Sequence, residues 1–198
     1  MWPPFSKEEL INAIEECNSS STPRPDKLSW KYLKKIVNNE ECINKFIDIA
    51  NTCIDIGYWL SHFKVLSTII ISKPNKASYN FPKSYCPIVL LNMIGKLFEK
   101  IISERLQFLS ISNNFIHSCQ LDRLKYRSTI DTSITLTYFV CTGWVKNLTT
   151  STLAFNIIQF FLLLNYQLLS LILNKTSFDH KILFFFRNYL VGKKTKYL

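Results

Sequence analysis

An asparagine interrupts a strongly apolar stretch in the last third of the chain. Residues 151–161 read STLAFNIIQFF, and Asn156 stands where the pattern of a buried strand favours leucine or isoleucine. Because a buried amide needs hydrogen-bond partners, two interpretations are open. Asn156 is either a satisfied polar group of the core or a position at which chemistry requires a polar atom.

Other short motifs follow one another in a fixed order. They are RPD at 24–26, ISKPNK at 71–76, SYCPI at 84–88, QLDRLKYRST at 120–129 and LLNYQLLSLIL at 163–173. No GxSxG, HExxH or CxxC motif occurs, and Gly95-Lys96 lacks the other residues of a P-loop. Each motif is weak alone, so the functional signal lies in their order and spacing.

Hydrophobic periodicity and capping residues predict the elements that position these motifs. The predicted helices cover about 6–17, a segment capped by Asp26 that runs to about 37, 43–54, 95–109, 130–146, 165–174 and 179–190. The β-branched run 65–72 (VLSTIIIS) predicts a strand, and further strands are expected after Pro87 and around Asn156. The pattern indicates an α/β protein with helices packed on small sheets.

The positive charge is concentrated in the last two-thirds of the chain. The 198 residues carry a formal charge of +10, made of −2 in residues 1–60 and +12 in residues 61–198. Lys and Arg gain from counterion release when they contact phosphates, so we expect an anionic partner, nucleic acid before a membrane surface. A solvated basic face remains the alternative.

Several features indicate an intracellular protein. The six cysteines form no CxxC motif, which is typical of a reducing compartment, and the N-terminus lacks the pattern of a signal peptide. Residues 152–173 are long enough to span a bilayer, but four amides interrupt them. We therefore expect a nuclear or cytoplasmic protein without a membrane partner, and keep a membrane anchor at 152–173 as a less favoured alternative.

At these motifs the chain resembles the reverse transcriptases of non-LTR, LINE-like retrotransposons, most closely their fungal forms. The resemblance implies a partial right-hand polymerase fold, with residues 1–60 as a helical lead-in and residues 61–198 as the fingers and the beginning of the palm. The family's Gly-Pro-Asp turn appears here as 24–26 (RPD), and its SYRPI motif as 84–88 (SYCPI). Its metal-binding Asp-Asp pair would lie beyond Leu198, so we expect a domain truncated before that motif.

The resemblance also implies roles for individual residues. Lys73 matches the fingers lysine that reaches the incoming triphosphate, and Cys86 stands where the family has an arginine that clamps it. Phe161 matches the aromatic residue that stacks under the sugar. The residues that would face the template phosphates are Arg123, Lys125 and Arg127. A solvated loop lysine at 73, a core aromatic at 161 and a solvated basic loop at 123–127 explain the same residues without function.

Asn156 falls on a metal-binding aspartate of the family. Two Mg²⁺ ions are held there by this aspartate and the later Asp-Asp pair, and they stabilise the attacking and leaving oxygens. Asparagine offers one neutral carbonyl oxygen where the cation prefers carboxylates, so we expect no intact metal site.

These expectations define the hypotheses. The first is a degenerate RNA-directed DNA polymerase domain, inactive here, whose ancestral partners are an RNA template and a DNA primer, with Mg²⁺ and no small-molecule cofactor. The alternative is a non-catalytic basic remnant that binds nucleic acid.

Overall fold

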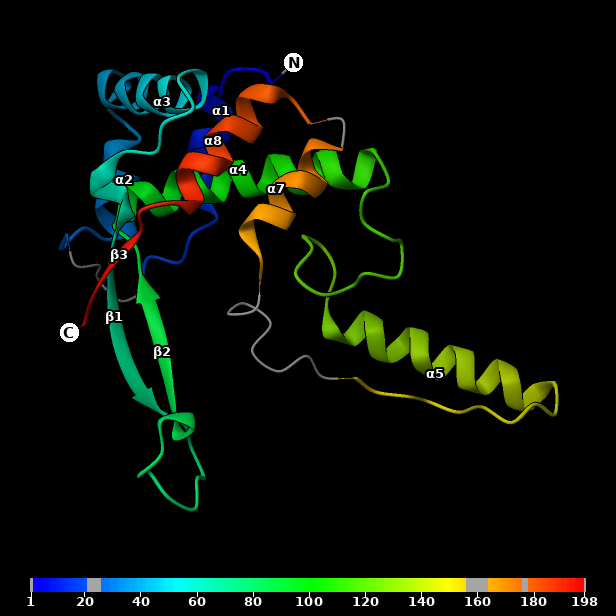
Figure 1. The fold of residues 1–198 in the computed structure, drawn as a ribbon. Helices are drawn as coiled ribbons and strands as arrows, with labels where there is room; N and C mark the ends of the chain where they lie inside the picture. The colour runs from blue at the N-terminus through cyan, green and yellow to red at the C-terminus, as the bar shows by residue number, and fades with distance from the viewer. Residues whose placement is uncertain (1, 21–25, 156–163, 176–177, 198) are drawn as a thin grey trace. The chain divides into compact units, whose positions relative to one another are not determined.

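The computed structural model of the chain describes residues 2–20, 26–155, 164–175 and 178–197 (Figure 1). The chain divides into two compact units, which are treated separately below. Unit 1 comprises Met1–Ile102 together with Tyr166–Leu198, and unit 2 comprises Ser103–Asn165.

Three helices open unit 1: α1 (Lys7–Glu15), α2 (Trp30–Ile36) and α3 (Glu40–Asp55). The predicted capping box at α1 is confirmed, because the Glu9 N–H donates to the Ser6 hydroxyl and the Ser6 N–H donates to the Glu9 carboxylate. The predicted end of α3 is also confirmed. Gly57 adopts the left-handed conformation (φ 61°), and a Cβ at this position would collide with the Phe184 ring.

A three-stranded sheet with the order β2-β1-β3 supports unit 1. Strand β1 (Val65–Ser72) has the predicted bounds and pairs antiparallel with β2 (Tyr85–Leu90), in a register that places Ile71 opposite Cys86. The second strand therefore begins before Pro87 rather than after it. An outer strand tolerates proline because it pairs on one side only.

The third strand was not predicted. Residues Lys194–Tyr197 form β3 and pair in parallel with β1, with Val65 opposite Lys194. The segment KTKY is short and lacks the alternation of apolar and polar residues that indicates a half-buried strand. The open edge of β1 supplies the hydrogen-bonding partner that makes it a strand.

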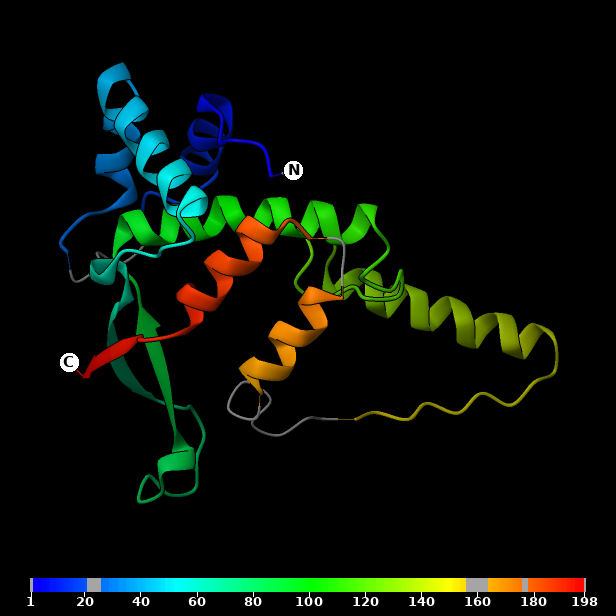
Figure 2. The same cartoon turned by 45° about the horizontal axis from the view of Figure 1, so that its top comes forward.

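Aromatic rings join α4 (Met93–Ser112) and α8 (His180–Leu190) in the core of unit 1. Trp59 is buried, with its ring centroid 5.1 Å from that of Phe63, 6.5 Å from Phe98, 5.5 Å from Phe185 and 5.6 Å from Tyr189. Figure 1 shows α8 crossing the first half of α4, and Figure 2 shows the beginning of α8 beside α4. The helix α7 (Tyr166–Asn174) packs on α8. The predicted helices at 95–109, 165–174 and 179–190 are thus present.

The role predicted for Asp26 is wrong. The residue before α2 is Ser29, and Asp26 lies further upstream, where its carboxylate accepts hydrogen bonds from the N–H groups of Leu28 (3.1 Å) and Met93 (2.8 Å). Met93 is the first residue of α4, whose first turn has N–H groups without helical partners. Asn92 accepts the Gly95 N–H at 2.7 Å. Asp26 therefore caps α4, a helix far from it in sequence, instead of α2.

Unit 2 contains the end of α4, a loop and the helix α5 (Thr129–Val145). The helix predicted at 130–146 is confirmed, and a capping box of Ser128 and Asp131 starts it. The strand predicted around Asn156 is not found in its described half. Residues 151–155 have no regular structure, with Leu153 and Phe155 exposed, and Asn156 lies outside the described residues. Strand β1 already has β2 and β3 on its two edges, so it has no edge left to pair with another strand.

The predicted α/β class is confirmed. The described residues contain seven α-helices and one three-stranded sheet. This mixture of helices and a small sheet is compatible with a partial polymerase fold.

Candidate functional site

The β1–β2 hairpin carries two of the predicted nucleotide-binding positions. Ile71 lies opposite Cys86, and the Lys73 N–H donates to the carbonyl of Ser84 at 2.9 Å, so the pairing continues past the end of β1. Lys73 therefore lies two residues beyond Ile71, the residue of β1 that pairs with Cys86. Residues 73 and 86, thirteen positions apart in the sequence, are brought close together by the register of one hairpin.

The Lys73 side chain has neutral partners in this loop. Its ammonium group donates to the carbonyl of Lys83 at 3.1 Å, and its own carbonyl accepts the hydroxyl of Tyr79 at 2.9 Å. A lysine ammonium has three donors. The contact with one carbonyl thus orients Lys73 and leaves the charge available to an anion.

Cys86 is exposed on the outer strand of the hairpin. A thiol is a weak donor without a permanent charge, whereas an arginine at this position would present a rigid fork of N–H donors to a phosphate. Position 86 therefore offers an anion only a weak, uncharged donor.

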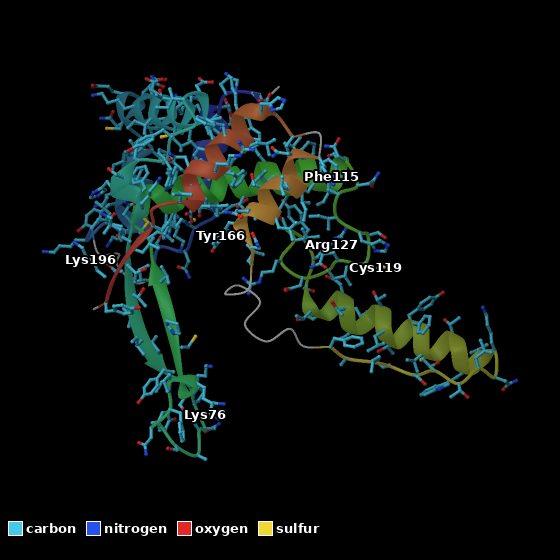
Figure 3. The ribbon with its side chains drawn as sticks, in the orientation of Figure 1. Lys76, Phe115, Cys119, Arg127, Tyr166 and Lys196 are labelled. Carbon is cyan, nitrogen blue, oxygen red and sulfur yellow. The ribbon has the colours of Figure 1, made fainter. Side chains whose placement is uncertain are left out.

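The end of this hairpin exposes apolar side chains on both faces. Ile70 and Ile71 are neighbours in β1, so their side chains point to opposite faces, yet they are 55% and 47% exposed. Figure 1 shows the two strands extending away from the helices of unit 1, and Figure 3 labels Lys76 in the loop at their end. An apolar run such as III at 69–71 is typical of a buried strand, so nothing in the sequence signals this exposure.

The predicted template-binding residues lie in a loop of unit 2 between α4 and α5. Arg127 donates to the carbonyls of Ser118 and Gln120, and Figure 3 shows Arg127 and Cys119 in the same loop. These two hydrogen bonds close the loop upon itself. Arg127 thus has a structural role, which the sequence motif does not distinguish from binding.

The other two basic residues of the loop differ in their pairing. Lys125 lies 3.4 Å from the carboxylate of Glu104, and its N–H donates to Gln107 at 3.0 Å. Arg123 is strongly exposed and its guanidinium is 3.8 Å from Asp122, also exposed. Exposed pairs at such a distance contribute little. Of the three, Arg123 is best placed to contact a phosphate.

The remaining predicted residues, Asn156 and Phe161, lie outside the described residues. Elsewhere, in the ranges that the structure describes, no group of three or more His, Cys, Asp or Glu side chains is placed to hold a metal ion.

The sequence leaves a membrane anchor at residues 152–173 as an alternative. Among the helices of the described ranges, none is both long and apolar enough to cross a bilayer.

Two curated proteins show local similarity to this chain. Over 128 residues it is 26% identical to the "Probable RNA-directed DNA polymerase from transposon BS" of Drosophila melanogaster, an alignment that covers 65% of this chain and 14% of that protein. Over 99 residues it is 29% identical to the "RNA-directed DNA polymerase from mobile element jockey" of the same organism, covering 50% of this chain and 10% of that protein. No protein-family model matches the chain.

The chain is similar to RNA-directed DNA polymerases of mobile elements. These similarities agree with the resemblance based on the motifs. Since the chain spans no more than 14% of either relative, the activities of those whole proteins enter below only as proposals.

Proposed function

We propose that residues 61–198 correspond to the fingers and the beginning of the palm of a reverse transcriptase domain from a retrotransposon, and that residues 1–60 form its helical lead-in. The element is of the non-LTR type, with fungal relatives. The similarity to two RNA-directed DNA polymerases of mobile elements supports this assignment.

One observation carries the proposal. The β1–β2 hairpin brings Lys73 close to Cys86, the two positions at which the family places its triphosphate-binding lysine and arginine. The Lys73 ammonium group donates to the carbonyl of Lys83, which is a neutral partner. This pairing supports the proposal that the hairpin corresponds to the family's triphosphate-binding hairpin, with Cys86 in place of one of its two cations.

We further propose that the 198-residue chain does not polymerise DNA. Asn156 replaces an aspartate that holds Mg²⁺ in the family, and the 198 residues contain no adjacent pair of aspartates. The chain would then retain contacts to an RNA template and a DNA primer without the chemistry. The basic loop, Arg123 above all, and the net charge of +10 support such binding. With the chemistry lost, the protein would act as a non-catalytic nucleic-acid-binding remnant.

Restoring the missing arginine tests the assignment of the hairpin. The variant Cys86→Arg is expected to bind a fluorescent deoxynucleoside triphosphate more tightly than the native chain, measured by fluorescence anisotropy without added metal. A hydrogen bond to a charged group contributes about 1.5–3 kcal/mol, or roughly 10- to 150-fold in affinity. The gain should disappear in the double variant Cys86→Arg/Lys73→Ala, because the two cations bind the same triphosphate.

A matched control separates this effect from added charge. Cys141 is also an exposed cysteine but lies on α5 in unit 2. The variant Cys141→Arg adds the same charge and should leave nucleotide affinity unchanged. If both arginine variants increase affinity equally, or if neither does, the hairpin is not a triphosphate site and the assignment fails.

A further inference from the structure

Unit 1 has a second concentration of positive charge, away from the motif series. It comprises Lys64 before β1, and Lys193, Lys194 and Lys196 at and within β3; His62 lies beside Lys64. We call it the β3 basic surface. No carboxylate lies within 4.0 Å of its four lysines in the part of the chain that the structure describes. The run KKTK was its only signal in the sequence.

Two of these lysines are held in place by neutral groups. The Lys64 ammonium donates to the carbonyl of Asn188 at 2.7 Å and to its side-chain oxygen at 3.0 Å. The Lys193 ammonium lies 3.7 Å from the centroid of the Tyr189 ring. Both side chains are therefore held in place by groups that do not neutralise their charge. A phosphate would meet ammonium groups that are already positioned, whereas a solvated lysine must first be ordered.

The electrostatic environment of Lys193 agrees with this arrangement. Its pKa is lowered mainly because burial disfavours the charged ammonium group; Glu99 opposes this shift, and the charge of Lys64 adds to it. The Glu99 carboxylate in turn accepts the Tyr189 hydroxyl. Lys64 and Lys193 thus repel each other, and a bound anion would reduce this repulsion.

A cavity of about 350 Å³ opens beside these groups. It is lined by Ser61, His62, Lys64, Val65, Gly192 and Lys194. Gly192 has a φ of 75°, and a Cβ built there meets no atom within 4 Å, so the wall on this side is open. The cavity is large enough for a phosphate group with its sugar.

The charge continues from the cavity along the strand. Side chains alternate between the faces of a strand, so Lys194 and Lys196 lie on one face, opposite Val65 and Ser67 of β1. Both lysines are exposed, and Figure 3 labels Lys196 on β3. A line of cations that extends from a cavity along a strand fits a chain of phosphates better than a single small anion.

We infer that the β3 basic surface binds the sugar-phosphate backbone of a single-stranded nucleic acid, with Lys64, Lys194 and Lys196 each contacting one phosphate. This binding site stands on the charge arrangement of unit 1 alone. It does not depend on the polymerase assignment, on the triphosphate hairpin or on the basic loop of unit 2. Sequence specificity is not expected, because lysine–phosphate contacts do not read bases.

The experiment compares two double variants of the full chain that have equal net charge. Lys194→Gln/Lys196→Gln removes two cations from the surface, and Lys31→Gln/Lys35→Gln removes two exposed cations from α2. Binding of a fluorescein-labelled single-stranded DNA of mixed sequence is measured by anisotropy over a series of salt concentrations. The first variant should lower the slope of log affinity against log salt by about 1.4, since each lost phosphate contact contributes about 0.7. The α2 variant should keep the native slope.

Two further arms make the result specific. Lys64→Gln lies outside β3 and should lower the slope by about 0.7, which excludes loss of the strand as the cause. If the ligand is the nucleic-acid backbone, inorganic phosphate should displace the labelled DNA no better than sulfate does at equal ionic strength. Equal slopes in both double variants, no binding by the native chain, or selective competition by phosphate would each overturn the inference. Failure of the Cys86→Arg experiment would leave it unaffected.

Discussion

The contact between Asp26 and α4 leads to a quantitative prediction about stability. Asp26 is the last residue of the RPD motif, and its carboxylate accepts the N–H groups of Leu28 and Met93. Replacement of Asp26 by alanine removes both acceptors at once. The Met93 N–H is the more sensitive of the two donors, because Met93 is fully buried and water cannot replace the lost carboxylate.

The expected loss follows from that burial. A buried donor without a partner costs about 1–3 kcal/mol, and removal of a helix cap costs a similar amount. With a urea dependence of about 2 kcal/mol per molar, a loss of about 2 kcal/mol lowers the unfolding midpoint by about 1 M. Asp26→Asn keeps one side-chain carbonyl oxygen and should lose roughly half as much as Asp26→Ala.

Pulse proteolysis in a urea series measures this midpoint on the full chain fused to a soluble carrier. Asp48→Ala is the matched control, since Asp48 is an exposed aspartate on α3 in the same unit. That substitution should change stability by no more than about 0.5 kcal/mol. An equal midpoint for the two alanine variants would refute the capping role of Asp26.

Four further outcomes are expected. The 198-residue chain should not extend a primer on an RNA template with Mg²⁺ or Mn²⁺. Loss of one preorganised electrostatic group, such as the carboxylate replaced at Asn156, lowers the catalytic rate by about 10²- to 10³-fold. Nucleotide incorporation above a no-enzyme control would contradict this prediction. Arg123→Ala should lower the salt slope of nucleic-acid binding by about 0.7–0.9. Arg127→Ala should lower it less, because the Arg127 guanidinium binds loop carbonyls. The reverse order would assign the phosphate contact to Arg127. The pKa of Asp179 lies below its ordinary value of 3.8, chiefly because the carboxylate accepts a backbone N–H at the start of α8. The ionised carboxylate therefore stabilises the folded state above about pH 3.8, and this stabilisation is lost as the pH falls through the lowered pKa. The midpoint deficit of Asp179→Asn should accordingly shrink on acidification, and a constant deficit would show that the charge is irrelevant. Finally, α5 has no buried residue within its own unit, so size-exclusion chromatography of the bare chain should show aggregates rather than a monodisperse monomer.

Local sequence patterns determined several elements of this protein. The capping box at α1 and the β-branched run of β1 act within one turn or one strand, so both can be predicted from neighbouring residues. The same holds for the capping box of α5. The candidate residues Lys73 and Cys86 were named by resemblance, and the roles proposed for them remain predictions.

Other features depend on contacts between distant residues. Asp26 caps a helix that begins 67 positions later, and β3 is a strand because β1 offers it an open edge. The triplet 184–186 (FFF) contains no local signal for which ring enters the core. Packing against Trp59 decides it, by burying Phe185 and leaving Phe184 exposed.

The same distinction applies to the charged residues. The sequence alone determined that residues 61–198 carry a large excess of lysine and arginine. Only the tertiary structure decided that Arg127 closes its own loop, whereas Lys64 and Lys194 line one cavity although 130 positions separate them. Charge is a property of each residue, but its availability to a phosphate depends on which groups the fold brings within hydrogen-bonding distance, and that distance is set by packing between segments far apart in the chain.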